Sequence, residues 1–269
     1  MKINSPAKEK TTQEPLTFPV LNSKIAGLSF EEALDTIFHL AVYQKSSYVC
    51  FANVHMVVEA YKNVKFQRVV NEADLAAADG LPISKYINFF FGKKIERVAG
   101  PDMMPRVMLR AAQEGKSVYF YGSSDEVLQK IRERASLDFP GLKIAGTYAP
   151  PFRQLSTTEK KAIVEEINGK SPDFVFVCLG CPKQEQWMNE HLNLINSCML
   201  GVGQAFGIYA GLTERAPMWM QKKGLEWAFR LYKEPMRLAR RYYYTNGVFL
   251  YLVIKLYFGK MRRKELLPV

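Results

Sequence analysis

Asp79 is the side chain in this sequence with the clearest potential for acid–base chemistry. It closes the apolar run LAAAD and is followed by Gly80, a residue that allows close approach of a backbone or a ligand. A carboxylate at the end of a buried strand is partly desolvated, and carboxylates with perturbed pKa values are typical of functional sites. Asp79 could instead cap a helix that begins after Gly80, because aspartate is a favoured N-cap residue. The residue type alone leaves both interpretations open.

Two further residues carry polar groups suited to a sugar or a phosphate. Asn53 ends an apolar run, where it could hydrogen-bond a sugar hydroxyl or merely cap the helix that begins at Val54. Arg97, in KKIERVAGPD, has the forked guanidinium group that binds phosphate oxygens, although a single arginine is more often a surface residue. Both residues are therefore candidates whose role depends on where the fold places them.

The segment CLGCPKQE, residues 178–185, contains a C-x-x-C pair, which in other proteins binds zinc or forms a redox couple. A structural zinc site needs four ligands, and the chain has neither a second C-x-x-C nor an H-x-H pair. A redox couple needs an exposed, activated thiol, whereas Cys178 falls inside an apolar run. We interpret Gly180 as the end of a strand and Pro182 as the first residue of a helix. The free N–H groups at this helix start then face a ligand, with Lys183, Gln184 and Glu185 as candidate contacts.

These residues follow apolar runs that favour strands, separated by amphipathic segments that favour helices. The expected strands cover residues 47–53, 74–79, 117–123, 142–146, 173–180 and 197–203. Capping boxes of the form S-x-x-E at Ser29, Ser123 and Ser156 start three of the helical segments. The alternation predicts an α/β fold with a mostly parallel sheet and flanking helices. Ligands of such folds lie outside the carboxyl ends of the strands. This rule also selects the glycine-rich run at residues 201–204, with Gly203 as a candidate binding residue.

The C-terminal fifth of the chain differs in composition and charge. Residues 215–269 contain 13 Lys and Arg and 3 Glu, a net charge of +10, whereas the whole chain carries +11. Such segregation favours an anionic partner, either nucleic acid or a lipid surface, over a merely solvated charged face. The apolar run at residues 248–258 is too short to cross a bilayer, which needs roughly 20 residues. It suits a helix that lies in the membrane interface, with a final core helix packed on the sheet as the alternative.

Several classes of protein are disfavoured by what the sequence lacks. It contains no D-x-D pair to hold a metal on a nucleotide diphosphate, no P-loop, no G-x-G-x-x-G and no G-x-S-x-G. Four cysteines are too few for a disulfide scaffold and fit a reducing cytoplasm. The first residues lack an apolar stretch after their basic residues, so we expect a polar mobile tail at residues 1–16 rather than a targeting peptide.

The order of several motifs resembles the WecG/TagA/CpsF family of bacterial glycosyltransferases. The motifs are NVHMVVEA, LAAADGLPI, ERVAGPD, FYGSS, FPGLKIAGTYAPPF, SPDFVFVCLGCPKQEQW, GVGQAF and GLEWAFRLYKEPMRLARRY, and they cover about residues 20–245. The resemblance implies a Rossmann-like core and a C-terminal appendage that reaches the membrane. It also implies an inverting, metal-independent enzyme without a cofactor. Such an enzyme moves a sugar from a UDP-sugar to a polyprenyl-diphosphate-linked acceptor at the cytoplasmic face of the membrane, in cell-surface polysaccharide synthesis.

The resemblance also implies roles for individual residues. Asp79 matches the proposed general base of the family. Residues that match the nucleotide-sugar pocket are Asn53, Arg97 and Gln184, and the candidate Gly203 falls in the same glycine-rich motif. Residues expected to bear on the diphosphate, the acceptor or the membrane are Arg230, Arg237, Arg240 and Arg241.

The chain departs from the family pattern near the expected donor pocket, so the donor sugar stays open. Phe51 stands where many members have threonine, and Gly207 stands where many have aspartate. The expected organisation is a core at residues 17–212 and an appendage at residues 213–269. A peripheral protein of the inner membrane face is expected, without nucleic acid as a partner, and a homo-oligomer is left open. The alternative function is a non-catalytic nucleotide-binding or membrane-tethered scaffold that uses the basic C-terminus.

Overall fold

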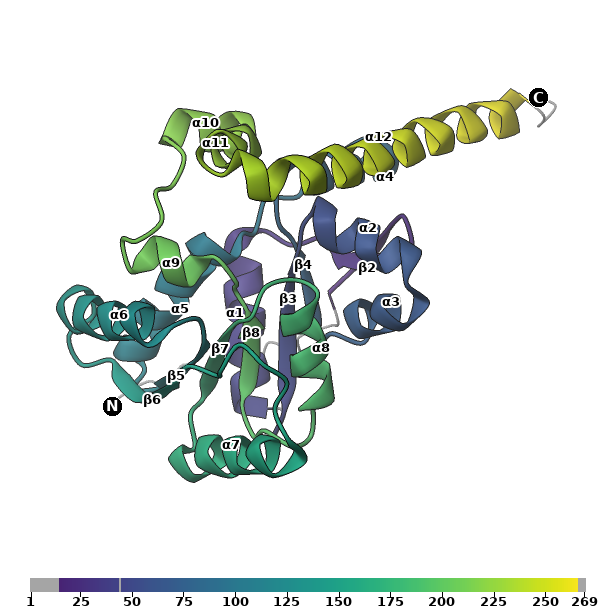
Figure 1. Cartoon of the computed structure of the whole chain (residues 1–269). Helices are drawn as coiled ribbons and strands as arrows, with labels where there is room; N and C mark the ends of the chain where they lie inside the picture. Colours follow the sequence, from purple (N-terminus) through teal and green to yellow (C-terminus); the bar gives the residue numbers. More distant parts are fainter. Residues whose placement is uncertain (1–14, 44, 266–269) are drawn as a thin grey trace, which may run out of the picture.

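The computed structural model describes residues 15–43 and 45–265, with side chains up to residue 259; residues 1–14 of the expected tail lie outside this range. Eight strands form one sheet in the order β1-β2-β4-β3-β8-β7-β5-β6 (Figure 1). β1 and β2 pair antiparallel, and the other neighbouring strands pair parallel. The strands are β1 Thr17–Val20, β2 Ser23–Ala26, β3 Ser47–Ala52, β4 Leu75–Ala78, β5 Ser117–Gly122, β6 Lys143–Tyr148, β7 Phe174–Cys178 and β8 Cys198–Gly201. The predicted α/β fold with a mostly parallel sheet is therefore confirmed.

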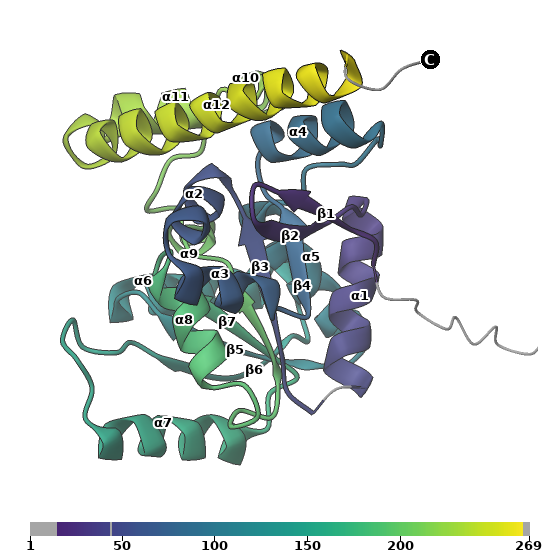
Figure 2. The same ribbon diagram turned by 90° about the vertical axis from the view of Figure 1, so that its right-hand side faces the viewer.

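Helices cover both faces of the sheet, which explains why its central strands are apolar without alternation (Figure 1, Figure 2). One face of β3 presents Val49 and Phe51 to a core shared with α1, α5, α6 and α9. The opposite face presents Tyr48 and Cys50 to a core shared with α2, α3, α7 and α8. The helices of the core are α1 Phe30–Tyr43, α2 Val54–Lys62, α3 Val64–Asn71, α4 Leu81–Phe91, α5 Gly100–Gln113, α6 Asp125–Asp138, α7 Thr157–Lys170, α8 Lys183–Glu190 and α9 Ala205–Tyr209.

Two of the three predicted capping boxes are confirmed. Ser29 exchanges hydrogen bonds with Glu32, and Ser156 exchanges them with Glu159 at the start of α7. The prediction at Ser123 is wrong by one residue. Ser124 is the N-cap of α6, while Ser123 has a left-handed backbone with φ 65° and belongs to the turn after β5. A second serine in the same turn thus takes the capping role.

The hairpin of β1 and β2 was not among the expected strands. Each of its strands has only four residues, and Pro19 lies within the first, where proline argues against a central strand. β1 tolerates this proline because it is the edge strand of the sheet. Val20 and Ile25 are fully buried, so the hairpin extends the core that the parallel strands begin.

The C-terminal appendage consists of α10 Met218–Lys223, α11 Glu226–Lys233 and α12 Pro235–Glu265. Two or three short helices were expected, but α12 is a single helix of 31 residues that extends across the carboxyl-end edge of the sheet (Figure 1). It packs on α2 and α4 rather than on the sheet itself, with the rings of Phe249 and Tyr86 6.2 Å apart. Within the described residues, no helix is both long enough and apolar enough to span a bilayer.

Candidate active site

A cavity of about 740 Å³ lies at the carboxyl ends of the strands, with α11 and α12 on its other side. We call it the strand-end cavity. The loops after β3, β4, β7 and β8 supply its floor, as the fold rule predicted. The structure thereby brings together most of the side chains singled out in the sequence: Asn53, Asp79, Arg97, Gln184, Gly203, Arg230, Arg237 and Arg241.

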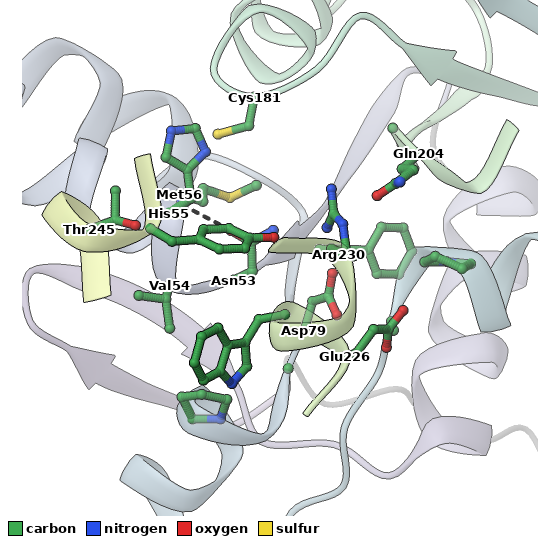
Figure 3. A pocket seen from close by; sticks show the side chains of 18 of the residues that line it. Asn53, Val54, His55, Met56, Asp79, Cys181, Gln204, Glu226, Arg230 and Thr245 are labelled. Atoms are coloured by element: carbon green, nitrogen blue, oxygen red, sulfur yellow. Dashed lines mark hydrogen bonds between the residues drawn. The ribbon is translucent and has the colours of Figure 1, made fainter. Parts of the chain in front are cut away.

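Asp79 lies on the floor of this cavity, next to Glu226 and Arg230 of α11 (Figure 3). It does not cap the following helix, because the N-cap of α4 is Gly80 and no side chain bonds the helix start there. Burial, with smaller contributions from the charges of Glu226 and Asp102, raises the pKa of Asp79 to about 7, although the positive charges of Arg97 and Arg230 oppose the rise. The carboxyl group is thus poised to take up or release a proton near neutral pH.

Asn53 caps a helix and also faces the cavity. Its side-chain oxygen accepts a hydrogen bond of 3.1 Å from the backbone N–H of Met56, so Asn53 caps α2. The same residue lines the strand-end cavity. The cap uses only the oxygen of this amide, so Asn53 can still offer a ligand its amide N–H groups.

Arg97 ties the core to the appendage. Its guanidinium group binds Asp102 at 2.6 Å and Glu226 of α11 at 3.0 Å. Arg215, in the segment that leads to α10, binds Asp102 at 2.7 Å and approaches Glu226 at 3.6 Å. Arg97 was predicted to clamp phosphate; in this structure its two terminal nitrogens hold carboxylates instead. The four charges form one network that positions α11 over Asp79.

Gln184 is held in a single orientation. Its amide nitrogen donates to the carboxylate of Glu185 at 2.6 Å and to the carbonyl oxygen of Gly201 at 2.9 Å. The carbonyl oxygen of Gly201 can only accept a hydrogen bond, so the side-chain atom that faces it must be the amide nitrogen. The other atom of the amide, Oε1, is therefore the oxygen, which is an acceptor. This oxygen is buried and has no partner within the protein. It lies close to Gly203, where a β-carbon would stand 3.3 Å away. Gln184 therefore offers a hydrogen-bond acceptor to a ligand.

The C-x-x-C pair forms neither a redox couple nor a metal site in the described part of the chain. Both thiols are free, and burial raises the pKa of Cys178 to about 12 and that of Cys181 well above its usual range. A protonated thiol is a poor nucleophile and a poor metal ligand. Among the described residues, no group of three or more His, Cys, Asp or Glu side chains is placed to hold a metal. Pro182 is the N-cap of α8, so the helix begins at Lys183, one residue later than expected.

The appendage arginines divide into two groups. Arg230, Arg237 and Arg241 line the strand-end cavity, and the Nε atoms of Arg230 and Arg241 are buried without a hydrogen-bond partner. Unpartnered buried donors on cationic side chains suit an anionic ligand. Arg240 is exposed and does not line the cavity, so the structure does not group it with the other three.

Three residues of the site were missed or unassigned by the sequence reasoning. Glu226 lies beside Asp79 and belongs to the motif GLEWAFRLYKEPMRLARRY, but the sequence pattern does not indicate that it pairs with Arg97. His55 lines the cavity, and burial together with the charges of Arg241 and Lys62 lowers its pKa to about 4. It is therefore a neutral imidazole at neutral pH. Phe51 also lines the cavity. Gly207 does not, and a β-carbon there would lie 2.6 Å from the hydroxyl of Thr213.

The chain is similar in sequence to known glycosyltransferases over most of its length. Residues 18–263 match the model of the Glycosyl transferase WecG/TagA/CpsF family. The chain is 31% identical over 198 residues to the N-acetylglucosaminyldiphosphoundecaprenol N-acetyl-beta-D-mannosaminyltransferase of Bacillus spizizenii (strain ATCC 23059 / NRRL B-14472 / W23), covering 73% of this chain and 75% of that relative. It is 26% identical over 223 residues to the protein of the same name in Bacillus subtilis (strain 168), covering 82% and 84%. The chain therefore belongs to the WecG/TagA/CpsF family and is a glycosyltransferase.

Proposed function

We propose that this enzyme transfers a sugar from a UDP-sugar to a saccharide carried on polyprenyl diphosphate, at the cytoplasmic face of the membrane, in cell-surface polysaccharide synthesis. The observation that carries the proposal is one cavity in which a carboxyl group titrating near neutrality faces arginines of the appendage. The acceptor class follows the names of the relatives, which act on N-acetylglucosaminyldiphosphoundecaprenol.

Asp79 is the group that accepts the proton in this reaction. A hydroxyl group of the acceptor attacks the anomeric carbon of the donor and loses its proton to the Asp79 carboxylate, while the bond to UDP breaks. Attack from the face opposite UDP inverts the anomeric configuration, so an α-linked donor yields a β-linked product. Glu226 and Asp102 favour this proton transfer because they raise the affinity of Asp79 for a proton.

The departing UDP gains negative charge, which Arg230, Arg237 and Arg241 are placed to neutralise. All three line the cavity, and two of them keep a buried Nε atom without a protein partner. Positive charges fixed in advance around a developing anion lower the barrier without further reorganisation. Because α11 and α12 carry these arginines, the site is complete only when the appendage lies over the core. This arrangement also limits hydrolysis of the UDP-sugar by water.

Recognition of the donor uses the polar atoms on the cavity floor. Gln184 accepts a hydrogen bond from a hydroxyl or N–H group of the UDP-sugar, and Asn53 donates one. The basic charge and the exposed apolar side chains of α12, including Leu250 and Ile254, suit a peripheral position on an anionic membrane. A non-catalytic scaffold would have no use for a carboxyl group of raised pKa opposite three arginines, so we favour the enzyme.

The pH dependence of transfer follows from the state of Asp79. Only the ionised carboxylate can accept a proton, and its pKa is raised to about 7. We expect kcat/KM to fall about tenfold per pH unit below pH 7 and to level off above it, because the ionised fraction of Asp79 falls about tenfold per unit below its pKa. Initial rates from pH 5 to 9 check this. A rate independent of pH between 5 and 7 would rule out Asp79 as the base.

The donor is identified by binding first and by turnover second. A panel of UDP-sugars, with UDP-N-acetylmannosamine as the first candidate from the names of the relatives, is screened for thermal stabilisation of the protein. The donors that stabilise it are then incubated with farnesyl diphosphate carrying N-acetylglucosamine, and mass spectrometry detects the disaccharide product. We expect one donor to raise the melting temperature and to be transferred. Stabilisation by UDP-sugars without any transfer would instead support the scaffold.

A further inference from the structure

A second cavity of about 730 Å³ lies between α11 and α12, beside the strand-end cavity. We call it the α11–α12 groove. α11 contributes Trp227 and Leu231 to its lining, and α12 contributes Ala239, Tyr243 and Gly247, which are spaced four residues apart and share one face of the helix. No charged side chain lines the groove within the described part of the protein. Its chemistry is therefore that of a site for an apolar ligand.

The groove is continuous with the strand-end cavity. Four residues line both: Trp227, Tyr242, Asn246 and Leu250. The rings of Trp227 and Tyr242 stand almost perpendicular, with centroids 6.4 Å apart, at this shared boundary. A ligand with a charged head and an apolar tail could therefore occupy both cavities at once.

The groove has two features that do not stabilise the fold: exposed apolar side chains and a glycine inside a helix. Tyr243 is 89% exposed and Leu250 is 59% exposed, so apolar surface is left facing solvent along one side of α12. Gly247 lies inside this long helix, where glycine is less favourable than almost any other residue. A β-carbon at Gly247 would have no atom within 4 Å, so packing against neighbours does not require glycine there. The missing side chain instead leaves the groove open.

We propose that the α11–α12 groove holds the first isoprene units of the acceptor's polyprenyl chain. The inference rests on the proposed function, in which the acceptor sugar attacks the donor inside the strand-end cavity. The polyprenyl chain on the acceptor's own diphosphate then leaves that cavity beside α12, and the neighbouring face of α12 is the groove. An isoprenoid has no hydrogen-bonding groups, which matches a lining that, apart from Asn246, consists of aromatic and aliphatic side chains.

The test fills the groove and compares two acceptors that differ only in the lipid. Both acceptors carry N-acetylglucosaminyl diphosphate, one on a farnesyl chain and one on an ethyl group, and rates are measured without vesicles. The unaltered protein should prefer the farnesyl acceptor by about tenfold or more in kcat/KM, because burial of apolar carbon is favourable. Gly247→Trp should remove this preference, since the indole occupies the open groove and tryptophan is compatible with a helix. Leu231→Trp, on the opposite wall, should do the same.

The matched control is Gly259→Trp, the same substitution on the same helix outside both cavities, which should keep the preference. Circular dichroism and binding of the UDP-sugar verify that each variant is folded. The assignment is overturned if both groove variants keep the full preference, or if the unaltered protein uses the two acceptors equally. Transfer to neither acceptor by the unaltered protein contradicts the proposed function, and the groove assignment falls with it.

Discussion

Replacing Asp79 by asparagine is expected to lower kcat for sugar transfer by about 10²- to 10⁴-fold, the usual contribution of a general base. Asparagine has nearly the same shape but cannot accept the proton of the attacking hydroxyl. The fold should persist, because Asp79 caps no helix and its ionised form is disfavoured by burial. Binding of the UDP-sugar should also persist, since the proposed contacts of the donor are Gln184, Asn53 and the arginines. Steady-state rates, melting temperature and calorimetric binding of the donor measure the three quantities.

The control for this variant is Asp125→Asn, an exposed aspartate in the first turn of α6 that does not line the strand-end cavity. It should transfer sugar at an unchanged rate. An Asp79→Asn protein that keeps more than about a tenth of the original kcat would show that another group accepts the proton.

Arg230→Gln should have the second largest effect, a fall in kcat/KM of about 10²- to 10³-fold, as when one stabilising donor is removed from a transition state. Arg230 reaches the cavity from α11, lies beside Asp79 and has a buried Nε atom without a protein partner. Its loss should also change the pH profile. The positive charge of Arg230 lowers the pKa of Asp79, so the acidic limb of the profile should move to higher pH in the variant.

Arg240→Gln is the informative comparison for Arg230. Both arginines lie in the same basic motif of the appendage, but Arg240 is exposed outside the strand-end cavity. In an assay without vesicles it should change kcat/KM by less than about threefold, as expected for a solvated charge. Equal losses in the two variants would mean that the motif acts through its total charge, and they would contradict the placement of Arg230 in the site.

The positions of strands β3 to β8 and of their polar ends could be predicted from the sequence, because they depend on local patterns. β3, β4 and β7 are continuous apolar runs, and in a parallel sheet the residues that follow them must meet at one edge. For this reason Asn53, Asp79 and Gln184 were selected before their contacts were known. The resemblance to the family added the arginines of the appendage, and the structure then separated Arg240 from the other three.

The remaining features depend on pairings over long distances, which a local pattern does not encode. Arg97 meets Glu226 across 129 residues of sequence, so its role as a tie to the appendage required the fold. The orientation of Gln184 depends on the carbonyl of Gly201, a backbone group that no sequence pattern marks. The length of α12 was missed because its basic first part and the apolar run that follows look like separate segments.

The most direct test of the account is the stereochemistry of transfer when divalent metal is removed. The identified UDP-sugar, α-linked to its nucleotide, is incubated with the N-acetylglucosaminyl diphosphate acceptor in excess EDTA, and nuclear magnetic resonance determines the anomeric configuration of the product. With Asp79 as the base and arginines at the leaving group, we predict a β-linked product at the same rate as without EDTA. An α-linked product, or loss of transfer on chelation, would contradict the account.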